Sequence, residues 1–591
     1  MSMIALLMGL LGCNPAPTQE QLDLTRGGRI DVYFNEPGTR HDNMWEPDAV
    51  DVLIDLIDQS NATLDMAVMG FNRQEVIDAV IEAWDRGVKV RMVGDAGHLY
   101  NSGYHQLDAR QIPMVTGNRP HIMHDKFFLI DGRFLYCGTA NITDTDLRHN
   151  SNNFVVIDSP AVVADFGAEF EQMWNGRYGH TKEEIDNGRV YRVGDTIVEV
   201  WFSPNEDAMG RIQEYVYGAQ ESLRFTIFAF TKDQVGSAFI LKQAQFEAWN
   251  EANGIDPDAP IDERHTVAGV VDQSQLHSNA QYHESYRLLA AGIPMRLDGD
   301  DNSLQPGDYQ AGGGRLHSKT MVIDAEGENP VVITGSFNWS SSATVSNDEF
   351  LLVLRGDPDA GPDGPSGKRI AAEYQAYFER LWDTGRHIGN SFVGEDLEPG
   401  ELIINEVMWY GVNDADPDGV DEFIELRNLT DNELDLSMWQ VVSERDFVVG
   451  LPPGSVVAPN DTFLILDHTM EVYQDGVPQD ELSAYTGGDL VTNPFNDNRQ
   501  SRLYLKDGSL GLALQDPRAN VADRAGDGGP AFYGGPSGSL VRSMERNPTP
   551  RDGTDPANWH ACTYGQGGIN VNPEFRSEII ATPGEENSPP P

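Results

Sequence analysis

Hydrophobic residues along the first two thirds of the chain form short continuous runs that alternate with longer runs of helical spacing. One face of a helix over residues 74–84 collects apolar side chains, namely Val76, Ile77, Val80, Ile81 and Trp84. Gly87 follows that run and ends the helix. Residues 239–249 have the same spacing. Strands that alternate with helices indicate an α/β fold.

The order of these runs occurs twice, which indicates a duplicated unit. The matching pairs are 30–35 with 198–203, 62–71 with 221–230, 87–95 with 266–272, 112–114 with 293–295 and 169–174 with 377–382. We therefore expect two pseudo-symmetric α/β halves, residues 29–195 and 196–386, whose matching strand ends meet at a shared cleft.

A different pattern begins at residue 401, after a linker that we expect at 387–400. Short apolar runs recur with turn signals between them and without helical spacing, at 402–407, 422–428, 434–439, 463–466 and 503–505. This pattern is typical of an all-β sandwich. We expect that domain at 401–587 and a disordered tail at 588–591.

The same polar pattern, H-x-K-x-x-x-x-D, stands once in each half. The residues that carry it are His124, Lys126 and Asp131 in the first copy and His317, Lys319 and Asp324 in the second. A Gly-hydroxyl-x-Asn run follows each copy, with Thr139 and Asn141 in the first and Ser336 and Asn338 in the second. On a strand, His and Lys two residues apart face the same side.

A histidine, an ammonium, a hydroxyl and an amide that meet at one point suit a phosphate oxyanion. Two copies also provide two imidazoles. One can attack phosphorus to form a phosphohistidine, while the other protonates the leaving oxygen and then activates water. Two lysines and two asparagines balance the phosphate charge, so we expect no metal and no other cofactor. Asp131 lies an odd number of residues from His124, and Asp131-Gly132 is a favourable hairpin turn. We therefore expect Asp131 and Asp324, at the far end of each pattern, to anchor local backbone and point away from substrate.

Residues from about 30 to 382 resemble the phospholipase D superfamily, whose signature is this paired motif with the trailing G-S-x-N run. The resemblance implies an α/β sandwich of two halves and metal-independent phosphodiester cleavage. It implies a catalytic set of His124, Lys126, Asp131, His317, Lys319 and Asp324. It also implies phosphate contacts from Lys126, Lys319, Asn141 and Asn338, with Thr139 and Ser336 as supporting donors.

The two halves differ downstream, where family members carry a carboxylate that orients the histidine. We assign this place to Glu349 in the second half and to Asn153 in the first. The halves are therefore not equivalent. By the usual assignment in the family, His124 is the nucleophile. The carboxylate of Glu349 could equally favour His317 as the nucleophile.

Residues 402 to about 587 resemble the lamin-tail domain, an immunoglobulin-like sandwich. The resemblance rests on residues 403–407, 421–426, 434–439, 543–546, 558–559 and 582–584. It implies a non-catalytic module that in bacteria accompanies secreted nucleases and other hydrolases. The acidic stretch Asp414 to Gly419 resembles a calcium loop; we interpret 414–422 as an acidic hairpin loop, with calcium binding as the alternative.

The net charge is −52, which disfavours tight binding of polyanions without excluding it. Residues 3–13 form a short apolar run that fits the core of a signal peptide. Leu10-Leu11-Gly12-Cys13 resembles a bacterial lipobox, although no Lys or Arg precedes the run. We expect export and lipidation at Cys13, which would anchor the protein to a membrane of the bacterial cell envelope. Plain secretion and an ordinary buried segment are the alternatives.

The expected function is phospholipase D-type hydrolysis of phospholipids. The alternatives are an exported nuclease that cleaves DNA or RNA and a catalytically silent phosphate-binding protein. The expected partners are a phosphodiester substrate and, through the anchor, a membrane; no obligate protein partner is expected.

Overall fold

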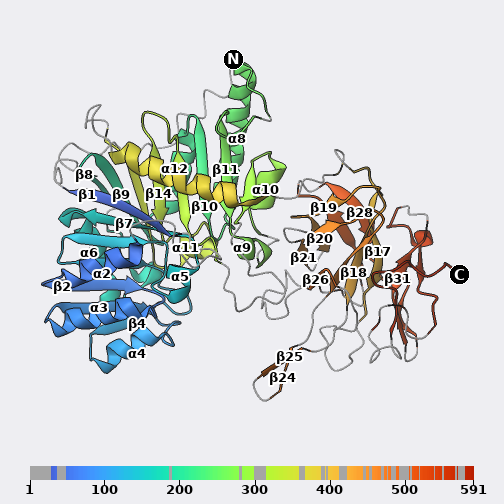
Figure 1. Ribbon diagram of the computed structural model, residues 1–591, viewed down its shortest axis with the longest axis horizontal. Helices are drawn as coiled ribbons and strands as arrows, with labels where there is room; N and C mark the ends of the chain where they lie inside the picture. The colour runs from blue at the N-terminus through green and yellow to red at the C-terminus, as the bar shows by residue number, and fades with distance from the viewer. Residues whose placement is uncertain are drawn as a thin grey trace. The chain divides into compact units, whose positions relative to one another are not determined.

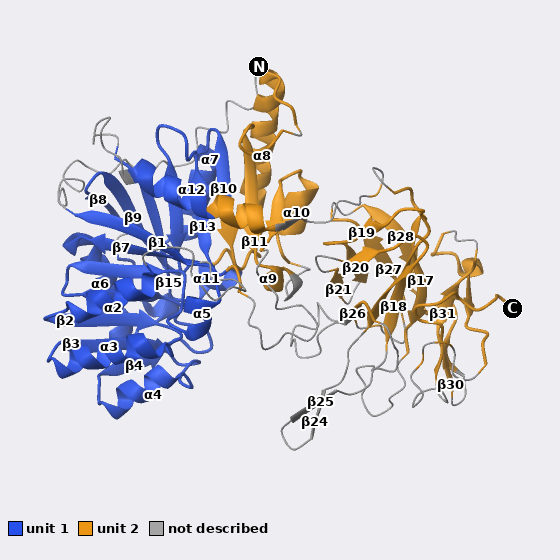
Figure 2. Cartoon of the chain, viewed as in Figure 1, with its two compact units in different colours: residues 1–224, 317–337, 341–377 blue, residues 225–316, 338–340, 378–591 orange. Residues whose placement is uncertain are grey.

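The computed structural model divides the chain into two compact units, which Figure 2 shows in blue and orange. Unit 1 comprises residues 1–224, 317–337 and 341–377, and unit 2 comprises residues 225–316, 338–340 and 378–591. The structure describes residues 28–35, 48–185, 189–257, 259–278, 282–298, 314–357, 366–387, 393, 397–410, 422–443, 447–451, 455–466, 471–474, 477–480, 488–491, 503, 505, 509–517, 520–537, 540–548, 552–565, 569, 571 and 579–591.

One sheet of unit 1 has the strand order β1-β7-β6-β5-β2-β3-β4 (Figure 1). Its strands are β1 (Arg29–Asn35), β2 (Thr63–Val68), β3 (Lys89–Asp95), β4 (Met114–Gly117), β5 (Lys126–Ile130), β6 (Phe134–Gly138) and β7 (Asn152–Asp158). Strands β2, β3 and β4 run parallel, while β5, β6 and β7 form an antiparallel meander. The predicted hairpin at Asp131 joins β5 to β6.

Helices α2 (Ala49–Asp58), α3 (Gln74–Asp85) and α4 (Ser102–Ala109) bury their apolar sides in the core on one face of this sheet. The predicted helix over 74–84 is thus confirmed. α6 (Pro160–Trp174) contacts β2, β3, β5 and β6. Its Phe166 ring lies 5.1 Å from that of Phe127 on β5, so α6 packs on the opposite face from the side chain of Phe128.

The other strands of unit 1 lie in the order β13-β14-β15-β9-β8, and each neighbouring pair is antiparallel. They are β8 (Arg189–Val193), β9 (Thr196–Ser203), β13 (Lys319–Ile323), β14 (Val331–Gly335) and β15 (Glu349–Gly356). The Phe166 ring of α6 also lies 5.1 Å from Phe202 on β9 and 5.4 Å from Phe350 on β15. One helix therefore joins the two groups of strands that carry the paired motifs.

The remaining helices of unit 1 are α5 (Asp144–Arg148), the 3₁₀ turn η3 (Gly179–Thr181), α7 (Ala208–Gly218), α11 (Ser341–Val345) and most of α12 (Ser366–Thr384). The division between the units falls inside β10 (Ser222–Ile227) and near the end of α12.

The first part of unit 2 contains α8 (Asp233–Asn253), α9 (Gln273–Ser278) and α10 (Ser285–Ala290). Its strand β11 (Thr266–Val271) pairs in parallel with β12 (Met295–Leu297), which pairs with β16 (Arg386–His387). An aromatic cluster of Phe230, Phe239 and Trp339 forms its core, with ring centroids 5.1–5.9 Å apart. The predicted helix over 239–249 is confirmed as part of α8.

The described residues from 397 onward form strands and one 3₁₀ turn, η4 (Pro556–Asn558). Two larger sheets, β26-β23-β18-β17-β31-β32 and β21-β20-β27-β28, enclose a core that includes Trp439 and Trp559. Their strands are β17 (Leu402–Met408), β18 (Phe423–Asn428), β20 (Gln440–Ser443), β21 (Val448–Gly450), β23 (Thr462–Leu466), β26 (Leu490–Val491), β27 (Leu512–Gln515), β28 (Val521–Ala525), β31 (Met544–Arg546) and β32 (Trp559–Ala561). The prediction of an α/β protein with an all-β C-terminal region is confirmed.

Smaller groups of strands complete this region. They are β19 (Leu434–Asp435) with β22 (Val456–Val457), β24 (Glu471–Gln474) with β25 (Val477–Asp480), and β29 (Gly535–Ser537) with β30 (Leu540–Arg542) and β33 (Ile579–Ile580). Leu503 and Leu505 are buried but lie in no strand, which corrects the prediction of a strand there. Cys13, the predicted linker apart from 387, 393 and 397–400, and the acidic stretch 414–421 lie outside the described residues. Residue 387 is the last residue of β16.

The predicted disordered tail is corrected for Ser588 and Pro589. Ser588 is buried, its backbone N–H donates to Glu545 Oε2 at 3.0 Å, and its carbonyl lies 2.9 Å from His560 Nε2. The Thr563 hydroxyl donates to the Pro589 carbonyl at 2.8 Å. These polar contacts, of which those of Ser588 are buried, hold the segment against β32, which its Pro-rich composition did not reveal.

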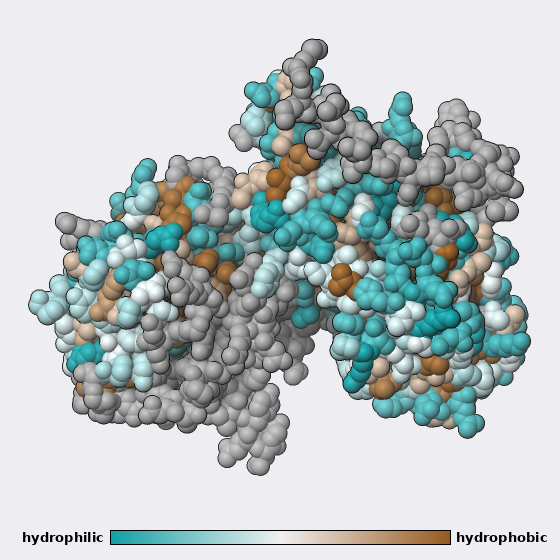
Figure 3. All heavy atoms as spheres, turned by 180° about the vertical axis from the view of Figure 1, so that it is seen from behind, coloured by the Kyte–Doolittle hydropathy of each residue, from teal (hydrophilic) through white to brown (hydrophobic). Residues whose placement is uncertain are grey.

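On the face that Figure 3 shows, the hydrophobic residues of the described part of the chain form small separate groups among hydrophilic ones. Some large apolar or aromatic side chains are exposed. The most exposed among the described residues are Tyr100, Leu241, Tyr282, Val345 and Trp249. None of the described helices combines the length and the apolar character that a membrane crossing requires.

Candidate active site

His124 stands just before β5 and is oriented from β15 of the second half. Its backbone N–H donates to the Asp348 carbonyl at 2.9 Å, and its Nδ1 lies 2.6 Å from Glu349 Oε2. An ionised carboxylate only accepts hydrogen bonds, so Nδ1 carries the proton. The lone pair of a neutral imidazole is then on Nε2.

His317 stands just before β13 and is oriented from β7 of the first half. Its backbone N–H donates to the Ser151 carbonyl at 2.9 Å, and its Nδ1 lies 3.1 Å from Asn152 Oδ1. Asn152 Nδ2 donates to the Asp146 carbonyl at 3.0 Å, which turns Oδ1 toward the histidine. Each half therefore positions the histidine of the other half.

The assignment of Asn153 as a histidine-orienting residue is corrected, because Asn152 fills that place. Asn153 Nδ2 instead donates to the hydroxyls of Thr334 and Tyr374, both at 2.7 Å. Neighbouring residues of a strand point to opposite faces, so only one of the two asparagines can reach His317. The idea that Glu349 serves His317 is corrected in the same way, since Glu349 contacts His124.

Thr139 and Ser336 hold the residues that orient the histidines. Thr139 Oγ1 donates to Asn152 Oδ1 at 2.8 Å, and Ser336 Oγ donates to Glu349 Oε2 at 2.7 Å. Each hydroxyl also accepts a backbone N–H at 3.0 Å. A hydroxyl has a single proton to donate, so the predicted role as phosphate donors is corrected to support of Asn152 and Glu349.

The two motif lysines are buried next to their histidines. Lys126 Nζ donates to the His124 carbonyl at 2.5 Å, and Lys319 Nζ donates to the His317 carbonyl. Burial lowers the pKa of Lys126 to about 8, although Glu349 and Asp146 oppose this shift.

The two motif asparagines make the same local contact in their own units. Asn141 Oδ1 accepts the Gly70 N–H at 3.4 Å in unit 1, and Asn338 Oδ1 accepts the Ala229 N–H at 3.4 Å in unit 2. In each case the carbonyl oxygen faces backbone, and the amide nitrogen is left as the donor that a phosphate oxygen requires.

Burial lowers the pKa of His124, with Lys126 and Lys319 adding to the shift and Glu349 opposing it. Burial alone would raise the pKa of Glu349, but His124 and Lys126 hold it below its usual value. The pair is therefore a neutral imidazole that donates to an ionised carboxylate. The action of Lys319 on His124 also indicates that both motifs share one electrostatic environment.

Asp131 and Asp324 anchor backbone at the far ends of β5 and β13. Asp131 accepts the backbone N–H groups of residues 61, 62 and 63, and Asp324 accepts those of residues 220, 221 and 222, at 2.7–3.1 Å. Both adopt positive φ, 52° and 50°. They contact neither histidine, so their place in the catalytic set is corrected to the anchoring role.

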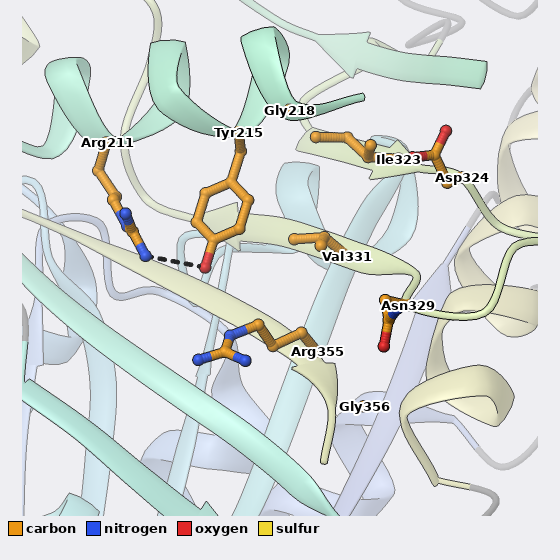
Figure 4. Close-up of a pocket in the computed structure, with 9 residues that line it drawn as sticks. All are labelled: Arg211, Tyr215, Gly218, Ile323, Asp324, Asn329, Val331, Arg355 and Gly356. Atoms are coloured by element: carbon orange, nitrogen blue, oxygen red, sulfur yellow. Dashed lines mark hydrogen bonds between the residues drawn. The ribbon is translucent and has the colours of Figure 1, made fainter. Parts of the chain in front are cut away.

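Figure 4 shows where Asp324 lies. With Arg211, Tyr215 and Arg355 it lines a cavity of about 340 Å³, and Tyr215 accepts a hydrogen bond from Arg211 at 3.0 Å. Asp324 follows β13 and His317 stands before it, so the two lie seven residues apart along extended chain, or about 23 Å at the usual rise of a strand. The cavity is therefore remote from the histidines.

Behind the site, Asp348 and Lys182 form a buried ion pair that sequence analysis missed. Lys182 Nζ lies 2.8 Å from Asp348 Oδ1 and also contacts Glu169, while Asn118 Nδ2 donates to Asp348 Oδ2 at 2.7 Å. Asp348 precedes Glu349 and accepts the His124 N–H, so the pair fixes the start of β15. Lys182 lies outside every recognised motif, and no sequence signal marks it.

Two further residues near His317 were missed, Asn152 and Asp146. Asn152 could have been found, because Asn152 and Glu349 follow Asn141 and Asn338 at the same interval. Within the described part of the chain, no group of three or more His, Cys, Asp or Glu side chains is arranged to hold a metal ion. The expectation that no metal takes part stays a prediction.

Comparison with known families confirms both resemblances. Residues 53–174 and 214–382 match the family described as "Cardiolipin synthase, PLD-like domain", and residues 397–529 match "Lamin Tail Domain". The chain is 29% identical over 131 residues to a mitochondrial cardiolipin hydrolase of Chlamydomonas reinhardtii, covering 22% of this chain and 59% of that protein. It is 28% identical over 112 residues to a phospholipase D of Rickettsia conorii, covering 19% and 56%.

The chain thus spans less than two thirds of the length of these curated relatives. Among solved structures, it is similar to Nuc of Salmonella typhimurium, a phospholipase D family member, at 22% identity. That similarity covers 25% of this chain and 95% of Nuc, with a TM-score of 0.22.

Proposed function

The chain carries a phospholipase D-like region followed by a lamin tail domain, and we propose that this region hydrolyses phosphodiesters through a phosphohistidine intermediate. The observation that carries the proposal is the pair of buried histidines, each held at Nδ1 by a residue of the opposite half. Nε2 of each ring is thereby left for chemistry. Lysine and asparagine donors beside them suit the phosphate oxygens.

We assign His124 as the nucleophile. Its Nε2 lone pair attacks phosphorus, the bond from phosphorus to the leaving oxygen breaks, and a protonated His317 gives its Nε2 proton to that oxygen. The His124 ring gains positive charge as the N–P bond forms. Glu349, ionised and 2.6 Å from Nδ1, stabilises that charge.

The second step reverses the proton flow. Neutral His317 takes a proton from water through Nε2, the water oxygen attacks phosphorus, and the N–P bond breaks. His124 returns to its neutral form, and the phosphate product leaves. Lys126, Lys319 and Asn141 serve as the donors that hold the phosphate oxygens through both steps.

Phospholipid is the proposed substrate. Several relatives are named mitochondrial cardiolipin hydrolase or phospholipase D, and a net charge of −52 repels long polyanions. The second candidate is cleavage of DNA or RNA, which the lamin tail domain favours because such domains accompany nucleases. A catalytically silent binding protein is the third candidate, and two intact sets of His and Lys argue against it.

The proposed setting is the bacterial cell envelope, with a lipid attached at Cys13. Expression in a bacterial host with radiolabelled palmitate should label the full chain and leave Cys13→Ser unlabelled. Equal labelling of both proteins, or of neither, would remove the anchor from the proposal without touching the catalytic assignment.

The test of the function uses purified full chain with a chelator, against vesicles of phosphatidylcholine or cardiolipin and against single- and double-stranded DNA. Release of headgroup or phosphatidic acid, lost in both His124→Ala and His317→Ala, is the expected result. Activity on DNA alone would replace the lipid proposal by the nuclease. Activity unchanged in both variants would contradict the mechanism.

A further inference from the structure

The carboxylate that orients His124 has no counterpart at the matching place beside His317. Glu349 and Asn152 occupy equivalent positions, because each is the first residue of its strand and each approaches Nδ1 of a motif histidine. Asn152 is neutral. A proton donor at His317 still needs a nearby anion, because burial disfavours the charged ring.

Asp146 on α5 is a carboxylate that lies close to this neutral position. Its Oδ1 is 3.8 Å from His317 Nδ1, and its side chain is buried. Its position is fixed on several sides. Oδ2 accepts the Asn141 backbone N–H at 2.8 Å, Oδ1 accepts from Asn150, and its carbonyl accepts from Asn152 Nδ2 at 3.0 Å.

The second half has no acid at the position that matches Asp146. Helix α11 follows Asn338 as α5 follows Asn141, and the residue at the same interval is Ala343, which is fully buried. One half therefore has an acid on the strand and alanine on the helix. The other half has an amide on the strand and an acid on the helix.

We infer that Asp146 is a positioning residue that supplies to His317 the negative charge that Glu349 supplies to His124. The inference rests on the proposed function for its catalytic meaning, since it makes His317 the ring that holds a proton for the leaving oxygen. Asp146 acts in two ways. Its charge favours the imidazolium at 3.8 Å, and its carbonyl fixes the amide that accepts from Nδ1.

Other charged groups close to His317 must be counted. Lys319 binds the His317 carbonyl and opposes a positive ring. Lys126 lies within the electrostatic reach of Asp146 as well. Glu349 is ionised as well, but it is bound to His124 Nδ1. Removal of the Asp146 charge therefore takes away the carboxylate that lies 3.8 Å from His317 Nδ1 and leaves the lysines in place.

The first test is an NMR titration of the full chain with ¹⁵N-labelled histidine, with His317 assigned from the His317→Gln spectrum. Asp146→Asn should lower the pKa of His317 by about one unit or more, because an opposite charge within 4–6 Å is removed. The matched control is Asp144→Asn, a neighbour on α5 that is 57% exposed and paired with Arg73. It should leave the pKa of His317 unchanged. Equal shifts, or none, would overturn the inference.

The second test places a negative charge beside His317 again, this time on β7 and not on α5. Asn152→Glu in the Asp146→Asn background places a carboxylate where Glu349 stands beside His124. It should raise the pKa of His317 again and return phosphodiester turnover to within a few-fold of wild type. A double variant with the same pKa and turnover as Asp146→Asn would overturn the inference.

A third measurement needs no substitution of Asp146, and so covers the case in which that variant does not fold. The ¹³C resonance of the Asp146 carboxyl in the wild-type chain should show a step at the pKa of His317, and His317→Gln should remove it. Absence of the step overturns the pairing. The titrations do not depend on turnover. If the wild type cleaves no phosphodiester, the proposed function is wrong, but the titrations still show whether Asp146 and His317 are paired.

Discussion

The two halves of the site share their geometry and differ in charge. In both, a motif histidine donates Nδ1–H to the first residue of a strand from the opposite half, and a hydroxyl from the G-x-x-N run supports that residue. Around His124 the partner is the carboxylate of Glu349, whereas around His317 it is the amide of Asn152. The two imidazole rings therefore have equivalent positions in the duplicated halves, but the groups that determine their protonation differ.

This difference assigns separate tasks to the two rings. A nucleophile needs a neutral ring before attack and an anion to stabilise the charge that then develops, and His124 has both. A proton donor needs a ring that is charged before attack, so an anion near His317 matters more than a hydrogen-bond acceptor does.

The largest difference is expected between Glu349→Gln and Asn152→Ala. Loss of the carboxylate should lower kcat by about 10⁴-fold, by analogy with other histidines whose orienting carboxylate is replaced by an amide. Asn152→Ala leaves the charge of Asp146 in place, and a loss of about tenfold is expected. Steady-state kinetics on the preferred phosphodiester measures both. Equal losses would mean that the halves are equivalent.

Removal of the supporting hydroxyls of Ser336 and Thr139 should also lower kcat more on the Glu349 side than on the Asn152 side, with smaller losses. Ser336→Ala removes a donor to Glu349 and should lower kcat by about tenfold, and Thr139→Ala should lower it less, since each removes about one hydrogen bond. Ser341→Ala, an exposed position on α11, is the matched control and should retain wild-type kcat. A greater loss in Thr139→Ala than in Ser336→Ala would reverse the comparison.

The deprotonation of Lys126 should be visible in the pH profile of kcat/KM. A lysine is charged below its pKa, and burial lowers that of Lys126 to about 8. kcat/KM should therefore fall above about pH 8, by about tenfold per unit, as the free enzyme loses this phosphate-binding charge. A kcat/KM that stays level to pH 10 would show that Lys126 keeps its proton there.

The anchoring aspartates should affect stability and leave chemistry unchanged. Asp131→Asn and Asp324→Asn each weaken charge-assisted bonds to three backbone N–H groups, and the free energy of unfolding in urea should fall by about 1–2 kcal/mol. kcat per folded molecule should not change. A loss of kcat at wild-type stability would return Asp131 to the catalytic set.

Much of this site follows from sequence alone. The paired motif identified both histidines, both lysines and the hairpin at Asp131, because a two-residue spacing on a strand and a turn dipeptide are local properties. The anchoring role of Asp131 also followed from strand parity. The all-β character of the C-terminal region was visible in the recurrence of short apolar runs.

The errors concern contacts between distant segments. Asn153 was preferred to Asn152 because both asparagines fit the local pattern, although the interval from Asn141 matches Asn152 as the interval from Asn338 matches Glu349. Asp146 was missed because it sits on a five-residue helix whose distance from His317 depends on packing between the halves. Thr139 and Ser336 were assigned to phosphate because their real partners lie on the next strand.

The central claim is that His124 alone forms the covalent intermediate, and acid-quench trapping with a ³²P-labelled phosphodiester tests it most directly. His317→Ala, with an activated leaving group that needs no proton, should accumulate label on His124, located by peptide mapping, because hydrolysis lacks its base. His124→Ala should show no labelled histidine. Label on His317 in the His124→Ala variant, or none in either variant under burst conditions, would contradict the account.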